Sequence, residues 1–251
     1  MGKKFSKDYE IHYYEVDYRL QSTITTIVNF MGDIGTEQSN KLGVGIEDLV
    51  LRNMTWVFYQ YDIKINRYPK YGERLKMVTE PSGFKKFYAT RDYIIYDEND
   101  NRVVEAKAIF FLINTEKRRA MRVPQDQYEI YGVEGDLGKD FKVDRLEKLE
   151  AIMYYKEFKT RYSDIDSNKH VNNTKYIEWA IETLPLELVK DYELKRVKVT
   201  FEKECLYGEE VCVSTQTRQE EDGTITSLHK IENSSGKEIT VLVGEWRKIN
   251  S

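Results

Sequence analysis

Residues 166–179 read DSNKHVNNTKYIEW, and this stretch joins a polar cluster to an amphipathic run. A carboxylate, a carboxamide and an imidazole stand at alternate positions, as Asp166, Asn168 and His170. Alternate side chains of an extended segment point the same way, so these three would converge on one pocket if the backbone there is extended. Titratable side chains grouped in this way favour a functional site over a structural role.

The amphipathic run predicts a helix from residue 172 to residue 183. Asn172 or Asn173 is a natural N-cap for this helix, because a carboxamide oxygen accepts hydrogen bonds from first-turn N–H groups. The helix would begin beside the polar cluster. Backbone N–H groups at its start, at Val171 and Asn172, are therefore candidates for binding a carbonyl oxygen as it gains negative charge.

The chain as a whole reads as two copies of one plan, each with an opening strand, a helix and a run of strands. In the first copy the predicted helices are 22–34 and 45–52, and the predicted strands are 9–18, 55–66, 74–83, 87–96 and 102–114. In the second copy the predicted helix is 172–183, and the predicted strands are 153–161, 194–203, 210–220, 224–232 and 238–249. Tyr71-Gly72-Glu73 and Tyr207-Gly208-Glu209 occupy the same place in the two copies.

This repetition predicts an N-terminal domain over residues 1–130 and a C-terminal domain over residues 151–251. Residues 131–150 between them are rich in glycine and charge, so we expect a linker that crosses the surface. A short helix is expected at the end of this linker, over residues 144–150.

The composition excludes several classes of protein. The chain has 251 residues, of which 33% are charged, and a formal net charge of −4, which argues against a nucleic-acid-binding protein. No apolar run approaches the length of a membrane span, and the N-terminus lacks the apolar core of a signal peptide. Cys205 and Cys212 make no disulfide framework, which favours the cytoplasm as a reducing compartment. The three histidines are spread along the chain, so we expect no zinc site.

Three separated motifs carry a resemblance to a known family. Residues 163–177 resemble the signature loop and helix of the acyl-ACP thioesterases of plant plastids and many bacteria. A second match is Phe201-Glu202-Lys203-Glu204-Cys205, where that family has a Glu-Cys pair in its active site. In the N-terminal half the matching residues are Trp56-Val57, Asp62-Ile63-Lys64-Ile65, Arg67-Tyr68-Pro69, Gly72-Glu73, Arg91-Asp92-Tyr93 and Arg118-Arg119. The resemblance spans about residues 9–248 and implies an α+β fold, a tandem double hotdog with two helices packed on one long antiparallel sheet.

The resemblance makes Glu204 a candidate catalytic carboxylate beside Asp166, Asn168 and His170. Glu204 would activate water or attack the thioester directly, while Asn168 and His170 orient the substrate carbonyl and the water. Asp166 would fix one of those two, although it could also serve only its own loop. Cys205 is a possible nucleophile with His170 as its base. Adjacent residues of a strand face opposite ways, so we expect Glu204 to face the pocket and Cys205 to face away.

The first copy has no Asp-x-Asn-x-His motif before its helix, and Tyr68-Pro69 stands in the place of Glu204-Cys205. We therefore expect an N-terminal domain that is catalytically silent and shapes the acyl pocket.

The resemblance implies hydrolysis of fatty acyl-ACP to free fatty acid and holo-ACP, which terminates fatty acid synthesis. The expected partner is acyl carrier protein with a phosphopantetheine-linked acyl chain, and no metal or redox cofactor is implied. Two alternatives stay open, an acyl-CoA thioesterase and a non-catalytic acyl-carrier-binding protein. A dehydratase is less favoured. Association into a homodimer is also left open.

Overall fold

The computed structural model describes residues 2–135, 137 and 142–249. The chain divides into two compact units. Unit 1 comprises Met1–Tyr59 and Ile65–Val143, and unit 2 comprises Gln60–Lys64 and Asp144–Ser251. The division after residue 143 falls inside the stretch that was predicted to be a linker.

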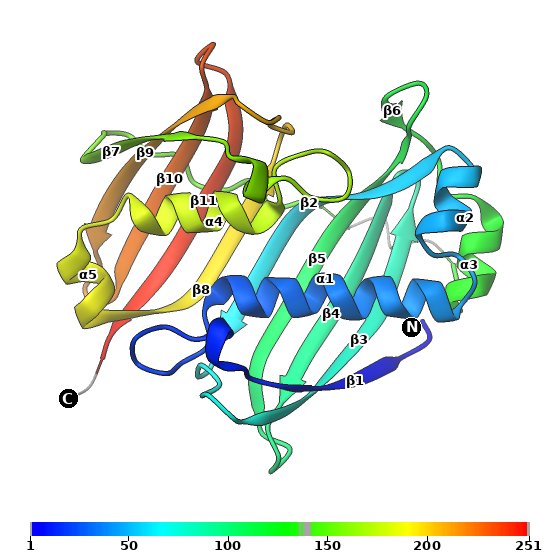
Figure 1. Cartoon of the computed structure of the whole chain (residues 1–251), viewed down its shortest axis with the longest axis horizontal. Helices are drawn as coiled ribbons and strands as arrows, with labels where there is room; N and C mark the ends of the chain where they lie inside the picture. Colours follow the sequence, from blue (N-terminus) through cyan, green and yellow to red (C-terminus); the bar gives the residue numbers. More distant parts are fainter. Residues whose placement is uncertain (1, 136, 138–141, 250–251) are drawn as a thin grey trace. The chain divides into compact units, whose positions relative to one another are not determined.

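Unit 1 is an antiparallel sheet with a long helix lying across it (Figure 1). Its strand order is β1-β3-β4-β5-β2, with β6 beside β5. The strands are β1 (Phe5–Glu10), β2 (Met54–Ile65), β3 (Arg74–Lys85), β4 (Tyr88–Tyr96), β5 (Arg102–Asn114) and β6 (Arg119–Ala120). The helices are the 3₁₀ helix η1 (Tyr13–Glu15), α1 (Ile24–Lys41), α2 (Ile46–Leu51) and α3 (Gln125–Tyr131).

Helix α1 forms because apolar side chains recur at helical spacing on one face. Thr23 caps its start by accepting a hydrogen bond from the Thr26 N–H at 3.2 Å. The helix was predicted to end at residue 34 but continues to Lys41. The buried stripe continues through Gln38, whose carboxamide accepts a hydrogen bond from the buried Arg91 guanidinium. The extension was not predicted because the helix pattern was based on apolar residues, and Gln38 on the buried face is polar.

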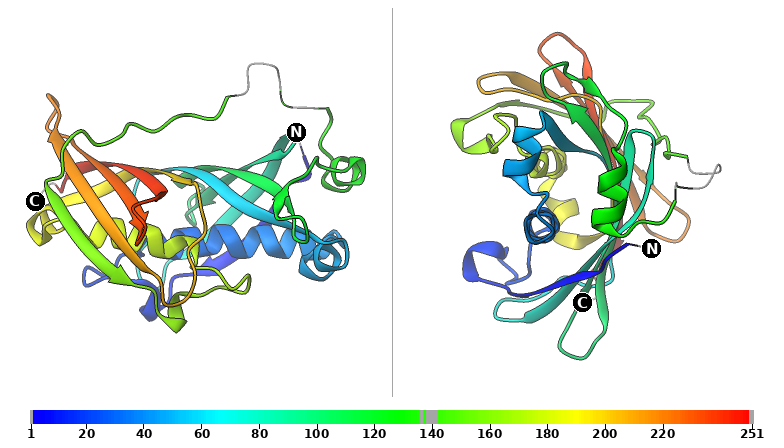
Figure 2. Two further views of the ribbon diagram at one scale, coloured as in Figure 1. Left: turned by 90° about the horizontal axis from the view of Figure 1, so that it is seen from above. Right: turned by 90° about the vertical axis from the view of Figure 1, so that its right-hand side faces the viewer.

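Helices α2 and α3 lie at the same end of unit 1 (Figures 1 and 2). An ion pair between Arg52, which follows α2, and Asp126 in α3 joins them at 2.7 Å. Helix α3, of seven residues, was not predicted from the sequence.

Unit 2 repeats the plan of unit 1, with α4 lying across β9, β10 and β11 (Figure 1). Residues Gln60–Lys64 of β2 pair with β8, and the strand order continues β8-β11-β10-β9-β7. The strands are β7 (Tyr154–Lys159), β8 (Tyr192–Phe201), β9 (Glu210–Gln219), β10 (Ile225–Asn233) and β11 (Glu238–Lys248). The helices are η2 (Tyr162–Asp164), α4 (Asn173–Glu182) and α5 (Leu186–Asp191). Strand β2 takes part in the strand order of both units, as the predicted long antiparallel sheet requires, and the α+β class is confirmed.

The buried face of α4 is aromatic. Tyr176 contacts Phe201 edge-on, with ring centroids 5.7 Å apart, and Trp179 stacks on Phe158 at 5.8 Å. The Trp179 contact fixes α4 against β7, and the Tyr176 contact fixes it against the end of β8, the strand that leads directly to the predicted catalytic carboxylate.

Residues 144–150 are not helical, so the predicted short helix there is wrong. They run over the face of the unit 2 sheet opposite α4 (Figure 2). Ion pairs hold them there, from Asp144 to Lys198 at 3.0 Å and from Glu147 to Arg218 at 2.6 Å. These contacts with the sheet replace the internal hydrogen bonds of a helix.

Candidate active site

The polar cluster of the sequence lies in a turn between η2 and α4. The Asp166 carboxylate oxygen Oδ1 accepts hydrogen bonds from the backbone N–H of Asn168 at 2.8 Å and of His170 at 3.2 Å. Lys169 has φ +66°, so the backbone here turns and is not the extended segment that was assumed. Asp166 therefore acts on Asn168 and His170 through their backbone, by holding the turn that carries them.

His170 meets Glu204 in unit 2. The imidazole Nε2 lies 3.1 Å from the Glu204 carboxylate oxygen Oε2, and the two side chains are 32% and 42% exposed. An imidazole and a carboxylate at this distance are within hydrogen-bonding range, and both side chains remain accessible to water. This is the geometry of a general base with a hydrogen-bonded partner.

Glu204 and Cys205 lie in the loop after β8, which ends at Phe201. The alternation of side chains in a strand therefore does not apply to them, although Glu204 is half-exposed and Cys205 is buried. Cys205 is 0% exposed, and its thiol donates to the Glu209 carboxylate at 3.1 Å. Burial and this hydrogen bond raise the pKa of the Cys205 thiol to about 12. A thiol held protonated in this way is a poor nucleophile.

The start of α4 is organised by backbone hydrogen bonds. The Val171 N–H donates to the Cys205 carbonyl at 2.9 Å, and the Asn172 N–H donates to the Asp164 carbonyl at 2.8 Å. Neither N–H is free, which differs from the expectation of free donors at these two residues. Asn172 is the N-cap, since its side chain accepts from the Thr174 N–H at 3.0 Å. Within the part of the chain that the structure describes, the Asn173 N–H is left without a partner.

Asn168 is exposed, and its carboxamide has no partner among the described residues. Asp164 is buried and pairs with Arg161, which donates from Nη2 at 2.9 Å and from its backbone N–H at 2.8 Å. Burial opposes ionisation of Asp164, but the hydrogen bonds from Arg161 outweigh it and lower the pKa of the carboxyl. Asp164 thus stabilises the loop, while Asn168 faces solvent beside the turn.

The same loop is present in unit 1. Asp17 Oδ1 accepts hydrogen bonds from the backbone N–H of Arg19 at 2.8 Å and of Gln21 at 3.1 Å. Leu20, with φ +58°, has the left-handed conformation of Lys169. The Ser22 N–H donates to the Pro69 carbonyl at 2.7 Å, as the next residue after the turn does in unit 2.

The two loops differ in their side chains. Arg19, Gln21 and Tyr68 stand where unit 2 has Asn168, His170 and Glu204. Unit 1 therefore repeats the backbone of the site without its imidazole and carboxylate, which supports the expectation of a silent copy. Sequence reasoning missed this repeat of shape, although the spacing of Glu15 and Asp17 before a helix matches that of Asp164 and Asp166.

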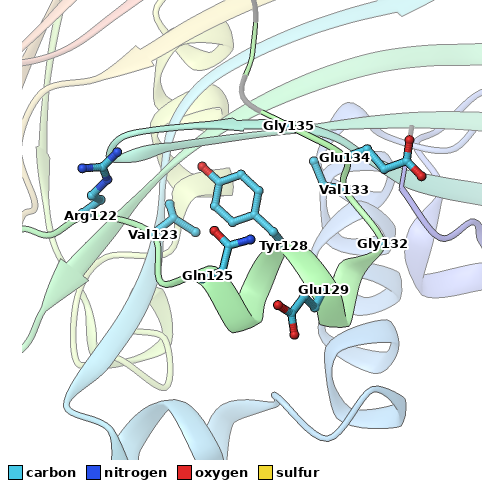
Figure 3. Close-up of a pocket in the computed structure, with 9 residues that line it drawn as sticks. All are labelled: Arg122, Val123, Gln125, Tyr128, Glu129, Gly132, Val133, Glu134 and Gly135. Atoms are coloured by element: carbon cyan, nitrogen blue, oxygen red, sulfur yellow. The ribbon is translucent and has the colours of Figure 1, made fainter.

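A pocket of about 620 Å³ lies in unit 1 beside α3 (Figure 3). It is lined by Arg122, Val123, Gln125, Tyr128, Glu129, Gly132, Val133, Glu134 and Gly135. Its lining includes none of the predicted site residues and carries both signs of charge. It does not have the apolar lining that a fatty acyl chain requires.

Among residues 2–135, 137 and 142–249, no group of three His, Cys, Asp or Glu side chains is placed to hold a metal ion. Within the same residues, no helix has the length and apolar composition needed to cross a membrane.

Comparison with known proteins gives matches to both halves of the chain. Residues 2–131 match the acyl-ACP thioesterase N-terminal domain, and residues 147–248 match the acyl-ACP thioesterase C-terminal domain. An acyl-[acyl-carrier-protein] hydrolase of Cuphea viscosissima is 25% identical over 265 residues, covering 100% of this chain and 64% of the relative. Oleoyl-acyl carrier protein thioesterase 1 of Arabidopsis thaliana is 26% identical, covering 98% of this chain and 77% of the relative.

The crystal structure of a provisionally assigned oleoyl thioesterase from Lactobacillus plantarum is similar throughout. Its TM-score is 0.93 at 26% identity, covering 100% of this chain and 98% of that one. The fold is therefore the expected tandem double hotdog. This chain spans 61–64% of the length of the Cuphea hydrolases that it matches.

Proposed function

The chain belongs to the acyl-ACP thioesterase family, and from that membership we propose that it hydrolyses fatty acyl-ACP to a free fatty acid and holo-ACP. The observation that carries the proposal is the His170–Glu204 pair at 3.1 Å, which lies in the half that matches the family's C-terminal domain. A non-catalytic carrier-binding protein would have no need of an accessible imidazole–carboxylate pair.

In the proposed mechanism the Glu204 carboxylate takes a proton from a water molecule, and the oxygen of that water attacks the thioester carbon. The C–S bond then breaks, and the phosphopantetheine thiol leaves as it gains a proton. His170, hydrogen-bonded to Glu204, orients the water. It also carries the proton that Glu204 takes from the water to the sulfur of the departing thiol. Direct attack by Glu204 would give an anhydride that water then hydrolyses, with the same products.

The thioester oxygen gains negative charge in this reaction and needs hydrogen-bond donors. We assign this role to the Asn173 N–H, at the positive end of α4, and to the exposed Asn168 carboxamide. Val171 and Asn172 support this site indirectly, because their N–H groups tie the start of α4 to the neighbouring loops.

Unit 1 is proposed to shape the acyl pocket and take no part in the chemistry. Its copy of the catalytic loop carries Gln21 and Tyr68, neither of which is a base at neutral pH. We also propose a cytoplasmic location, which agrees with the two free cysteines. Light scattering on the purified chain decides between a monomer and a homodimer.

The experiment that tests this function compares matched acyl-ACP and acyl-CoA substrates of varied chain length and saturation. Free fatty acid is measured by chromatography, with Glu204→Gln as the control for contaminating activity. We expect release from acyl-ACP by the native protein and almost none by the variant. Preferential release from acyl-CoA would make the protein an acyl-CoA thioesterase, and binding of acyl-ACP without release would make it a carrier-binding protein.

A further inference from the structure

We propose that Glu209 is a positioning residue for the His170–Glu204 pair, an inference that rests on the proposed thioesterase function. Glu209 lies at the end of the turn that follows Glu204 and Cys205. One of its carboxylate oxygens, Oε2, accepts the Leu206 N–H at 3.0 Å and the Cys205 thiol at 3.1 Å. A single oxygen thus holds the two residues that come directly after the catalytic carboxylate.

The residue held by Glu209 also holds the other half of the site. The Cys205 carbonyl accepts the Val171 N–H at 2.9 Å, and Val171 directly follows His170. The Cys205–Val171 hydrogen bond therefore joins the two loops one residue away from both members of the catalytic pair. A shift of Cys205 therefore moves Glu204, its neighbour in the chain. It also moves His170, because the Cys205 carbonyl is hydrogen-bonded to Val171, the neighbour of His170.

The turn behind Cys205 is anchored on its far side by the buried Thr160. Its hydroxyl donates to the Leu206 carbonyl at 2.8 Å, and its N–H donates to the Glu209 carbonyl at 2.9 Å. Gly208 has φ +82°, a conformation that strains other residues. Thr160 fixes the backbone of the turn, whereas the Glu209 carboxylate is the nearer of the two partners of the Cys205 thiol, which also contacts the Leu206 carbonyl at 3.9 Å.

Unit 1 contains the same turn without the chemistry. Glu73 Oε2 accepts the Lys70 N–H at 2.9 Å, and Gly72 has φ +74°. Glu73 also forms an ion pair with Arg67, so its removal disturbs unit 1 at least as much as removal of Glu209 disturbs unit 2. Glu73 is therefore a matched control for any loss caused by structural damage alone.

The test uses Glu209→Ala, Glu209→Asp, Glu209→Gln and Glu73→Ala in the full chain, with kcat and KM for acyl-ACP. A displacement of about 1 Å costs about 100-fold in a positioned reaction, so we expect Glu209→Ala to lower kcat about 10- to 100-fold with little change in KM. Glu209→Gln keeps an oxygen within reach of the Leu206 N–H and should retain most activity. Glu209→Asp keeps the charge but shortens the reach, and should lose more than Glu209→Gln. Glu73→Ala should leave kcat near that of the native protein.

The second readout is the NMR signal of the His170 imidazole, which is one of only three in the chain. We expect it to move in Glu209→Ala and to stay in place in Glu73→Ala, even if the native protein proves inactive on acyl-ACP. Failure of the proposed function would thus not hide the positioning effect. An unmoved His170 signal with kcat unchanged in Glu209→Ala overturns the inference. So does an active Glu209→Asp beside an inactive Glu209→Gln, since charge would then be the cause. If Glu209→Ala does not fold, Glu209→Asp supplies the same two readouts.

Discussion

Glu204→Gln separates the carboxylate mechanism from a cysteine mechanism. The substitution keeps the size of the side chain and removes its basicity. A general base contributes about 10²–10⁴-fold to a rate, so we expect kcat to fall about 10³-fold. Each tenfold loss corresponds to about 1.4 kcal/mol of activation free energy, which makes the expected loss about 4 kcal/mol.

The competing role of Cys205 can be judged from the same structure. With a thiol pKa of about 12, the thiolate fraction at pH 7 is on the order of 10⁻⁵. The thiol is also 0% exposed and directed at Glu209, away from solvent. Cys205→Ser leaves a hydroxyl that donates to the same carboxylate, so we expect it to keep most of the activity.

The assay is steady-state release of free fatty acid from acyl-ACP, with the melting temperature of each variant measured in parallel. Half-exposed ion pairs contribute at most about 1 kcal/mol to folding, so Glu204→Gln should melt close to the native protein. A Glu204→Gln variant with nearly native kcat, beside an inactive Cys205→Ser variant that is folded, would refute the reasoning. An acyl group trapped on Cys205 would refute it as well.

Other perturbations test the remaining parts of the account. Asp166→Ala removes the acceptor of two backbone N–H groups and should lower kcat about 10- to 100-fold. Asp166→Asn keeps an oxygen acceptor and should lower kcat much less. Equal losses in the two variants would contradict the proposal that Asp166 acts by holding the turn. Burial opposes ionisation of Asp62, but the hydrogen bonds and charge of Arg196 outweigh it and lower the pKa below the ordinary 3.8. The stability that this pair contributes is therefore present above pH 3.8 and lost as pH falls through the lowered pKa. Urea unfolding of Asp62→Asn should show that loss already at pH 7 and less further loss in acid. Ile27→Ala, on the buried face of α1, should shift chain-length preference by about 1–3 kcal/mol per methylene; an unchanged profile at a lower rate would restrict Ile27 to packing.

The strands and both long helices could be predicted from the sequence because their signals are local. Period-two patterns, punctuated by turn residues, placed the strands β2 to β5 and β7 to β11 within a few residues of their observed ends. The predicted first strand, 9–18, is wrong, because β1 is Phe5–Glu10 and residues 13–15 form the 3₁₀ helix η1. The short α3 and α5 were not predicted, whereas the equally short α2 was. The end of α1 was missed because Gln38, a polar side chain, occupies a buried position beside Arg91.

The sequence predicts which residues form the candidate site better than it predicts how they are arranged in space. The motifs identified His170 and Glu204, but their separation of 34 positions in the sequence does not tell how far apart the two side chains lie in space. The left-handed Lys169 and the end of β8 at Phe201 depend on tertiary contacts, so the sequence suggested extended backbone at both places. The role of Glu209 depends on a thiol and an N–H that meet one carboxylate oxygen, a convergence that no local sequence pattern predicts.

The central claim is that His170 and Glu204 act as one catalytic unit on acyl-ACP. The most direct measurement is a double-mutant cycle, with kcat for fatty acid release determined for the native protein, His170→Ala, Glu204→Gln and the double variant. Residues that act as a unit are strongly non-additive, so the double variant should be about as slow as the slower single variant. Losses that multiply in the double variant, or single variants that release fatty acid at the native rate, would contradict the account.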